Sequence, residues 1–177
     1  MPGASKMELL LLPHLDAAYN LARWLMRNEQ DAKDIVQESY IRAFKFFDTW
    51  KGEVDAKPWL LKIVRNCCYT SLKKGQSRQD VLEYDDEVHG GQPESDDPET
   101  LLLQKLDHAQ AKSALERLSI VFREALILSE VEGLSYKEIA EVMGIPAGTV
   151  MSRISRARAK LKDLMSGTDK KEVEHSK

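Results

Sequence analysis

The residues of this chain best suited to chemistry are hydroxyl and basic side chains close to its C-terminus. Between Val150 and Leu164 the sequence holds five basic residues and one acidic residue. Arginine can donate paired hydrogen bonds to guanine, and hydroxyl groups and lysine can bind phosphates or base edges. The predicted chemistry is non-covalent reading of DNA, and the candidate residues are Thr149, Ser152, Arg153, Ser155, Arg156, Arg158 and Lys160.

The elements that must position these side chains have the pattern of a helix-turn-helix. Ser135 and Glu138 are spaced as a capping box, and Gly144 ends a helix too short to be stable alone. A turn through Ile145 and Pro146 leads directly into a longer helix. Charge alone would favour a solvated surface helix, so it is the helix-turn-helix context that favours DNA binding. The apolar positions expected to face the core are Val150, Ile154, Ala157, Leu161 and Leu164.

Catalytic and metal chemistry find little support. The sequence contains no catalytic triad pattern, phosphate-binding loop or pair of carboxylates at catalytic spacing. Cys67 and Cys68 are adjacent, without other ligands at metal-binding spacing, so we expect helical positions half inside a core, with a redox-sensing thiol as the alternative. We therefore expect no enzymatic activity, no metal and no cofactor. The histidines are scattered at His14, His89, His108 and His175.

Charge is segregated along the chain, although the net charge is only −3. From Gly75 to Thr100 there are nine acidic residues and one basic residue, which leaves the flanking parts mildly basic. Glycine, proline and few large apolar residues predict a flexible acidic linker over 75–97. It is interpreted as a solvated spacer; the alternative is that its carboxylates mimic phosphates and delay DNA binding.

Helical periodicity predicts an all-α fold of two small helical domains, over 7–74 and 98–166, followed by a disordered tail over 167–177. The first domain should contain three helices, the second capped by Asn28 and the third by Asp55. The second domain should begin at the cap Asp97, and Ser119 should cap its next helix. No apolar run is long enough for a membrane span or a secretory signal, so a cytoplasmic location is expected.

From about Leu9 to Met165 the chain resembles the extracytoplasmic-function group of bacterial sigma factors, in the sigma-70 family. The resemblance rests on DAKDIVQESYIRAFKFF at 31–47, KPWLLKIVRN at 57–66 and PAGTVMSRISRARAKL at 146–161. It implies a factor that binds core RNA polymerase and promoter DNA, initiates transcription, and is regulated by an anti-sigma protein. A stand-alone helix-turn-helix regulator, which would bind duplex DNA as a dimer without polymerase, is the alternative.

The resemblance also assigns roles within the first domain. The exposed face of its second helix would bind the clamp coiled coil of polymerase through Asp34, Gln37, Glu38 and Arg42. The loop from Thr49 to Asp55 and the third helix would capture the −10 element, because a flipped base needs hydrogen-bonding edges and phosphates need cations. Trp59 is expected to pack in the core. The implied −10 residues are Trp50, Lys51, Lys62, Arg65 and Asn66.

In the second domain the resemblance implies recognition of the −35 element. Ser152 and Arg156 would read bases, and Thr149 and Arg153 would anchor phosphates, with Ser155 flanking this face. Arg158 and Lys160 would act as supporting cations. Met151 stands where related factors often carry a cation, which implies one phosphate contact fewer.

Overall fold

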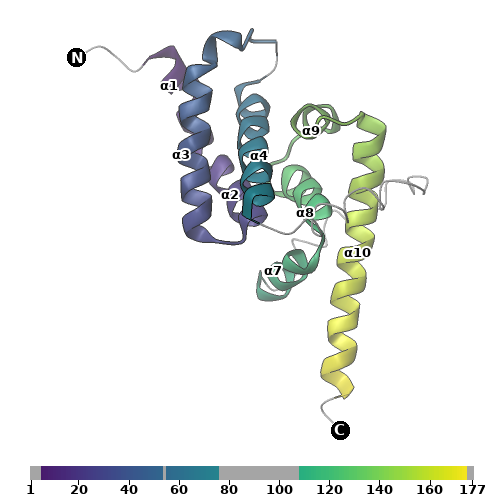
Figure 1. Cartoon of the computed structure of the whole chain (residues 1–177). Coiled ribbons are helices and arrows are strands. Elements are labelled where there is room, and N and C mark those ends of the chain that lie inside the picture. The colour runs from purple at the N-terminus through teal and green to yellow at the C-terminus, as the bar shows by residue number, and fades with distance from the viewer. Residues whose placement is uncertain (1–4, 54, 76–107, 175–177) are drawn as a thin grey trace.

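The computed structural model describes residues 5–53, 55–75 and 108–174, and within these ranges it contains helices and no strand (Figure 1). This confirms the all-α prediction. Most of the predicted linker and the predicted cap Asp97 lie outside the described residues. Nowhere in the described ranges is a helix long and apolar enough to cross a membrane.

The first domain is built from α1 (Lys6–Leu11), α2 (Leu15–Met26), α3 (Glu29–Lys45) and α4 (Ala56–Gly75), with short 3-10 turns η1 (Leu12–His14) and η2 (Phe47–Thr49). The single first helix predicted from the sequence is divided at η1, because Pro13 has no backbone donor to continue the ladder. A capping box at Ser5 and Glu8 starts α1. The hydroxyl of Tyr40 in α3 donates to the Leu11 carbonyl at 2.8 Å and fixes α1 against α3.

Helix α3 begins as the sequence predicts. The side chain of Asn28 accepts a hydrogen bond from the Asp31 backbone at 2.9 Å, and Glu29 and Asp31 lie in the positive first turn. Residues Ile35, Val36 and Ala43 of α3 pack inward against α2 and α4. The three longer helices therefore enclose the apolar core of the first domain.

The second domain contains α7 (His108–Arg117), α8 (Ile120–Leu126), the π-helical turn η4 (Ile127–Val131), α9 (Tyr136–Met143) and α10 (Ala147–Glu174). The capping box of Ser135 and Glu138 is present, and Gly144 ends α9 with a left-handed φ of 67°, as predicted. Ser119 occupies the N-cap position of α8, but its hydroxyl makes no capping hydrogen bond, so this part of the prediction is wrong. Helix α10 continues to Glu174 and covers most of the segment predicted as a disordered tail.

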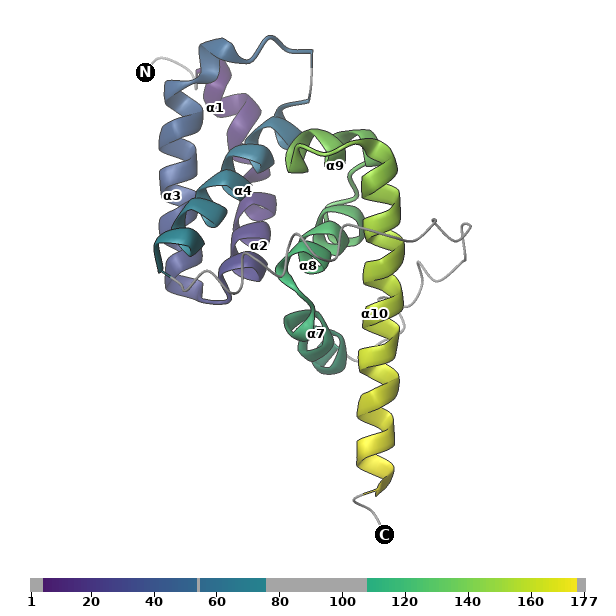
Figure 2. The same cartoon turned by 45° about the vertical axis from the view of Figure 1, so that its right-hand side comes forward.

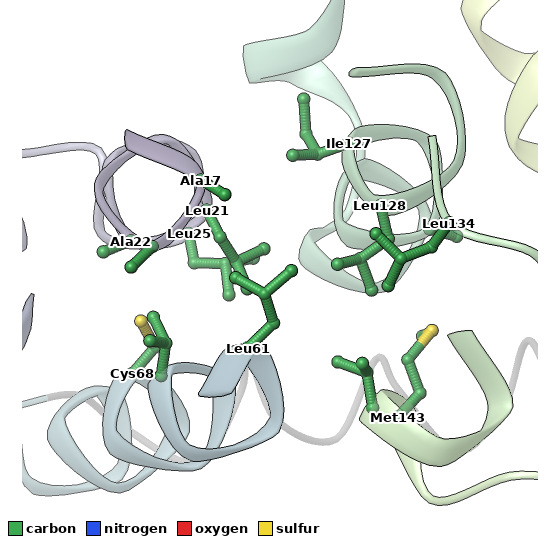
Figure 3. Packing of buried hydrophobic residues seen from close by; sticks show 14 of the residues in the cluster. Ala17, Leu21, Ala22, Leu25, Leu61, Cys68, Ile127, Leu128, Leu134 and Met143 are labelled. Carbon is green, nitrogen blue, oxygen red and sulfur yellow. The ribbon is translucent and has the colours of Figure 1, made fainter. Parts of the chain in front are cut away.

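The two domains pack against each other (Figures 1 and 2). Helix α9 lies against α4, and α8 and η4 lie against α2. In Figure 3, Leu61 of α4 lies between Leu21 and Leu25 of α2 on one side and Leu128 and Met143 of the second domain on the other. Buried side chains from both domains thus form one continuous apolar cluster, which was not predicted from the sequence.

Gly144 and Gly148 provide a matched test of the helix-turn-helix geometry. A Cβ would meet nothing within 4 Å at either position, but only Gly144 has a left-handed backbone. We expect Gly144→Ala to lower the free energy of unfolding by about 1 kcal/mol, because a side chain is strained at that φ. Gly148→Ala, inside α10, should raise it by roughly 0.5 kcal/mol. Urea denaturation followed by circular dichroism measures both, and an equal loss in the two variants would contradict the assignment.

Candidate nucleic-acid interface

Helix α10 presents one face to the core and the opposite face outward, as the helical periodicity predicts. Val150, Ile154, Ala157 and Leu161 are at most 2% exposed, and α10 packs on α7, α8 and α9. On other sides of the helix, Thr149, Ser152, Ser155 and Arg156 are partly exposed, and Ala159 and Lys160 are exposed. Ser152 and Arg156, spaced four residues apart, therefore lie on the same outward face.

Arg153 does not lie on this outward face. Its residue exposure is only 5%, and it is close enough to the Glu124 carboxylate to affect that group electrostatically. The reason is its position one turn after Val150 and directly beside Ile154, where a long side chain turns toward the core. Arg153 was predicted as a phosphate anchor, but in this conformation its side chain is buried.

Two further predicted cations have partners within the second domain. Arg158 forms an ion pair with Glu130, whose side chain is 13% exposed. The ammonium of Lys160 lies 4.8 Å from the centre of the Phe122 ring, a cation–π contact. Both cations are held in defined positions at the side of α10, and Lys160 remains exposed.

A second candidate surface lies on α3. Its predicted polar residues Asp34, Gln37, Glu38 and Arg42 are all exposed, and Glu38 and Arg42 form an ion pair at 2.7 Å. The structure adds Ile41, which is 61% exposed among them. Ile41 was not among the residues predicted from the sequence. The spacing in the sequence could have identified it. Ile41 follows Gln37 by four residues and Glu38 by three, so it shares their face of the helix.

Some of the predicted −10 residues lie on the surface of the first domain, and others are partly buried. Lys51, Lys62 and Asn66 are exposed, whereas Trp50 is partly buried. The Trp50 ring packs 5.7 Å from Phe47 and 6.4 Å from Trp59, measured between ring centres. Trp59 is partly buried against the core, as predicted. The packing of Trp50 holds the start of the 50–55 loop against the first domain.

Arg65 was grouped with Lys62 and Asn66 from the sequence, but its guanidinium points to the second domain. It forms an ion pair with Glu124 of α8, whose side chain is 0% exposed. The Tyr69 hydroxyl donates to the other carboxylate oxygen of Glu124 at 2.7 Å. Burial raises the pKa of the Glu124 carboxyl, and the Arg65 charge, the hydrogen bonds from Tyr69 and Arg65, and the Arg153 charge oppose that rise.

Glu124 is the residue of this inter-domain contact that was missed in the sequence. One feature of the sequence could have indicated it: the charged residues Arg123 and Glu124 interrupt the apolar run from Ile120 to Leu128. A charge in such a run is buried and needs a partner. The sequence does not show that this partner comes from the other domain.

The two cysteines lie in the buried part of α4. Cys67 is 2% exposed and Cys68 is 0% exposed, and both are free thiols. Burial, followed by the nearby Glu124 charge, raises the pKa of Cys68. A buried thiol held neutral is a poor nucleophile. Among the described residues, no three His, Cys, Asp or Glu side chains are grouped so that they could hold a metal ion.

Two families match this chain in succession. Residues 10–78 match the family described as Sigma-70 region 2, and residues 108–161 match Sigma-70, region 4. The first range covers most of the first domain, including the exposed face of α3. The second contains α8, α9 and the outward residues of α10 from Thr149 to Lys160.

Characterised proteins give the same result. The chain is 35% identical over 160 residues to the ECF RNA polymerase sigma factor SigE of Mycolicibacterium smegmatis, a match covering 89% of this chain and 60% of that protein. It is 37% identical over 134 residues to the ECF RNA polymerase sigma-E factor of Salmonella typhimurium, covering 72% of this chain and 70% of that protein. The match to the first relative thus spans less than two thirds of its length.

Solved structures share the fold. The sigma factor RpoE of Bartonella quintana, in complex with the anti-sigma factor NepR, aligns with a TM-score of 0.70 at 31% identity, covering 92% of this chain and 98% of that one. CnrH, in complex with the cytosolic domain of CnrY, aligns with a TM-score of 0.59 at 25% identity, covering 91% and 88%.

The different burial of Arg153 and Arg156 predicts different effects on stability. We expect Arg153→Ala to lower the free energy of unfolding by about 1–3 kcal/mol, because it removes a buried side chain and a positive charge near Glu124. Arg156→Ala, on the outward face, should change it by at most about 0.5 kcal/mol. Chemical denaturation of the two variants measures this difference, and equal stability would contradict the burial of Arg153.

Proposed function

Because the chain belongs to the extracytoplasmic-function group of the sigma-70 family, we propose that it is an alternative sigma factor, which directs core RNA polymerase to promoters and starts transcription. The observation that carries this proposal is the pairing of two surfaces in one chain. One is the outward face of α10 in a helix-turn-helix, and the other is the exposed face of α3 in a region 2 domain. A stand-alone regulator would not need the second surface.

Polymerase binding is assigned to the exposed face of α3. Protein interfaces combine an apolar centre with a polar rim, and the strongest contacts lie at the desolvated centre. Here Ile41 supplies the apolar centre, surrounded by Gln37, Glu38 and Arg42, with Asp34 further along the helix. The i,i+4 ion pair of Glu38 and Arg42 orders both side chains before binding. We infer that this face binds the clamp of polymerase.

Promoter reading is assigned to both domains. In the second, Ser152 and Arg156 would contact bases of the −35 element in the major groove, with Thr149 at the start of the helix near a phosphate. Lys160 would supply a phosphate contact from the side of α10. In the first, Lys62 and Asn66 on the exposed face of α4 would contact the opened −10 element.

A regulatory partner and a location follow from the same assignment. The relatives RpoE and CnrH were solved with protein partners, and NepR, the partner of RpoE, is an anti-sigma factor. We propose that this chain is likewise bound by an anti-sigma protein, acts in the cytoplasm where polymerase works, and contributes binding and not catalysis.

Transcription by purified core polymerase tests the function directly. Fragments of the source genome are transcribed with and without the protein, and RNA 5′ ends are sequenced. We expect new start sites that share two upstream motifs at a fixed spacing. Ile41→Ser should weaken binding to core polymerase by about tenfold or more, the usual loss at the centre of an interface, whereas Thr70→Ala on the exposed side of α4 should not. No protein-dependent start sites would overturn the proposal.

Arg156 and Lys160 should differ in kind as DNA contacts. If Arg156 pairs with a base, Arg156→Ala should cost about 1–3 kcal/mol of binding free energy and relax the preference at one promoter position. Lys160→Ala should weaken all sequences about equally and lower the salt dependence of binding. Binding of the holoenzyme to a set of −35 variants, repeated at several salt concentrations, separates the two. A uniform loss for Arg156→Ala would contradict base reading.

A further inference from the structure

Several contacts between the two domains share one polarity. Arg27, Lys57, Arg65 and Tyr69 of the first domain are donors, and the acceptors are the backbone carbonyls of Glu116 and Glu132 and the carboxylates of Glu124 and Glu132 in the second. The Lys57 ammonium lies 2.9 Å from the Glu132 carbonyl and 3.3 Å from its carboxylate. In these contacts, basic and hydroxyl groups of the first domain meet carboxylates and backbone carbonyls of the second.

The first-domain donors on α4 belong to one stripe of that helix. Lys57, Leu61, Arg65 and Tyr69 follow each other at intervals of four residues, so they share a face. Leu61 is 0% exposed within the cluster that both domains build (Figure 3). Arg65 and Lys57 beside it are paired with carboxylates. The second domain thus covers a face of α4 that adjoins the exposed Lys62 and Asn66.

A carboxylate that accepts hydrogen bonds from arginine, lysine and tyrosine is chemically similar to a DNA phosphate, which is bound by the same donors. Glu124 is the strongest case, because its carboxylate is fully buried and receives both Arg65 and Tyr69. Arg65 lies in the helix to which −10 capture is assigned, one residue before Asn66. Three groups of α4 that could bind a phosphate, on Lys57, Arg65 and Tyr69, are thus already paired with carboxylates of the same chain, whereas Lys62 and Asn66 remain exposed.

We propose that the second domain holds the free factor closed by presenting Glu124 and Glu132 as substitutes for DNA phosphates, and that Arg65 exchanges Glu124 for promoter DNA when the domains separate. This inference rests on the proposed function. It assigns the phosphate-mimicking role, which the sequence suggested for the acidic linker, to two residues of the second domain. The linker itself lies outside the described residues.

A buried ion pair is suited to such an exchange. Removing one partner leaves the other charge buried without compensation, so the closed state persists unless both charges find new partners together. Polymerase that holds the two domains apart would let water reach Glu124, while DNA phosphate replaces it at Arg65. Opening without a ligand is therefore unfavourable, and a ligand that binds the open state better shifts the population toward it.

The test begins with the free, full-length protein in a Cys67→Ala background, so that Cys68 is the one remaining thiol. Glu124→Gln keeps the size of the side chain but leaves Arg65 without its carboxylate. Glu141→Gln, the same substitution at an exposed position of α9, is the matched control. Tyr69→Phe removes one hydrogen bond to Glu124 and retains the charge pair.

Two measurements report opening. We expect Glu124→Gln to raise the radius of gyration in small-angle X-ray scattering, with unchanged helix content by circular dichroism. The reaction of Cys68 with Ellman's reagent should become at least about tenfold faster, because a buried pair has been broken. Part of that increase comes directly from removing the Glu124 charge, which, after burial, raises the pKa of Cys68, so Tyr69→Phe, which keeps this charge, should give a smaller increase that reports exposure alone. Glu141→Gln should match the parent protein. A radius for Glu124→Gln equal to that of Glu141→Gln would overturn the proposal, whatever the thiol rate.

DNA competition tests the exchange itself. A fluorescein-labelled, A/T-rich single-stranded 20-mer should bind free Glu124→Gln at least about fivefold more tightly than the parent, since a competing carboxylate is gone. An opened variant with no gain in binding would refute the substitution of phosphate by Glu124. Holoenzyme assembled with Glu124→Gln should transcribe as the parent does. Absence of transcription from both proteins would instead refute the proposed function, whatever the scattering shows.

Discussion

A carboxylate buried in an apolar environment must be neutralised or paired, and Glu124 meets this requirement through the other domain. Its side chain is fully inaccessible, yet it lies in a helix whose other residues are mostly apolar. Its two hydrogen-bond donors are Arg65 and Tyr69, which lie more than fifty residues earlier in the chain. The position of α8 against the first domain, the burial of Leu61 and the inward turn of Arg153 are all consistent with this one requirement.

The closed packing sets the availability of the surfaces used in function. The face of α3 that is assigned to polymerase stays exposed, with Ile41 at its centre. The outward face of α10 also remains partly exposed. By contrast, one side of α4, in the same domain, is covered by the second domain. In the closed state that we propose, the factor would meet polymerase before α4 could bind an opened promoter.

The helix ends are fixed by local interactions inside each domain, whereas the contacts between the domains combine ion pairs with a shared apolar cluster. Capping boxes at Ser5 and Ser135 and the left-handed Gly144 fix the helix ends without help from the other domain. The inter-domain contacts add Lys57 with Glu132 around the shared cluster. Such a contact can be separated by a partner that supplies replacement bonds, while the helices themselves persist.

The sequence by itself determined most of the helices, the caps at Asn28 and Ser135 and most of the outward residues of α10, because these depend on residues within a few positions of each other. Asn28, Ser135, Gly144 and the repeat from Val150 to Leu161 needed no knowledge of the fold. It also determined the family, through three motifs in order. Only the tertiary structure decided that Arg65 meets Glu124, that Arg153 is buried and that Leu61 lies in a cluster shared by both domains. These facts depend on contacts between distant segments, and a helical wheel gives the direction of a side chain but not the partner that lies there.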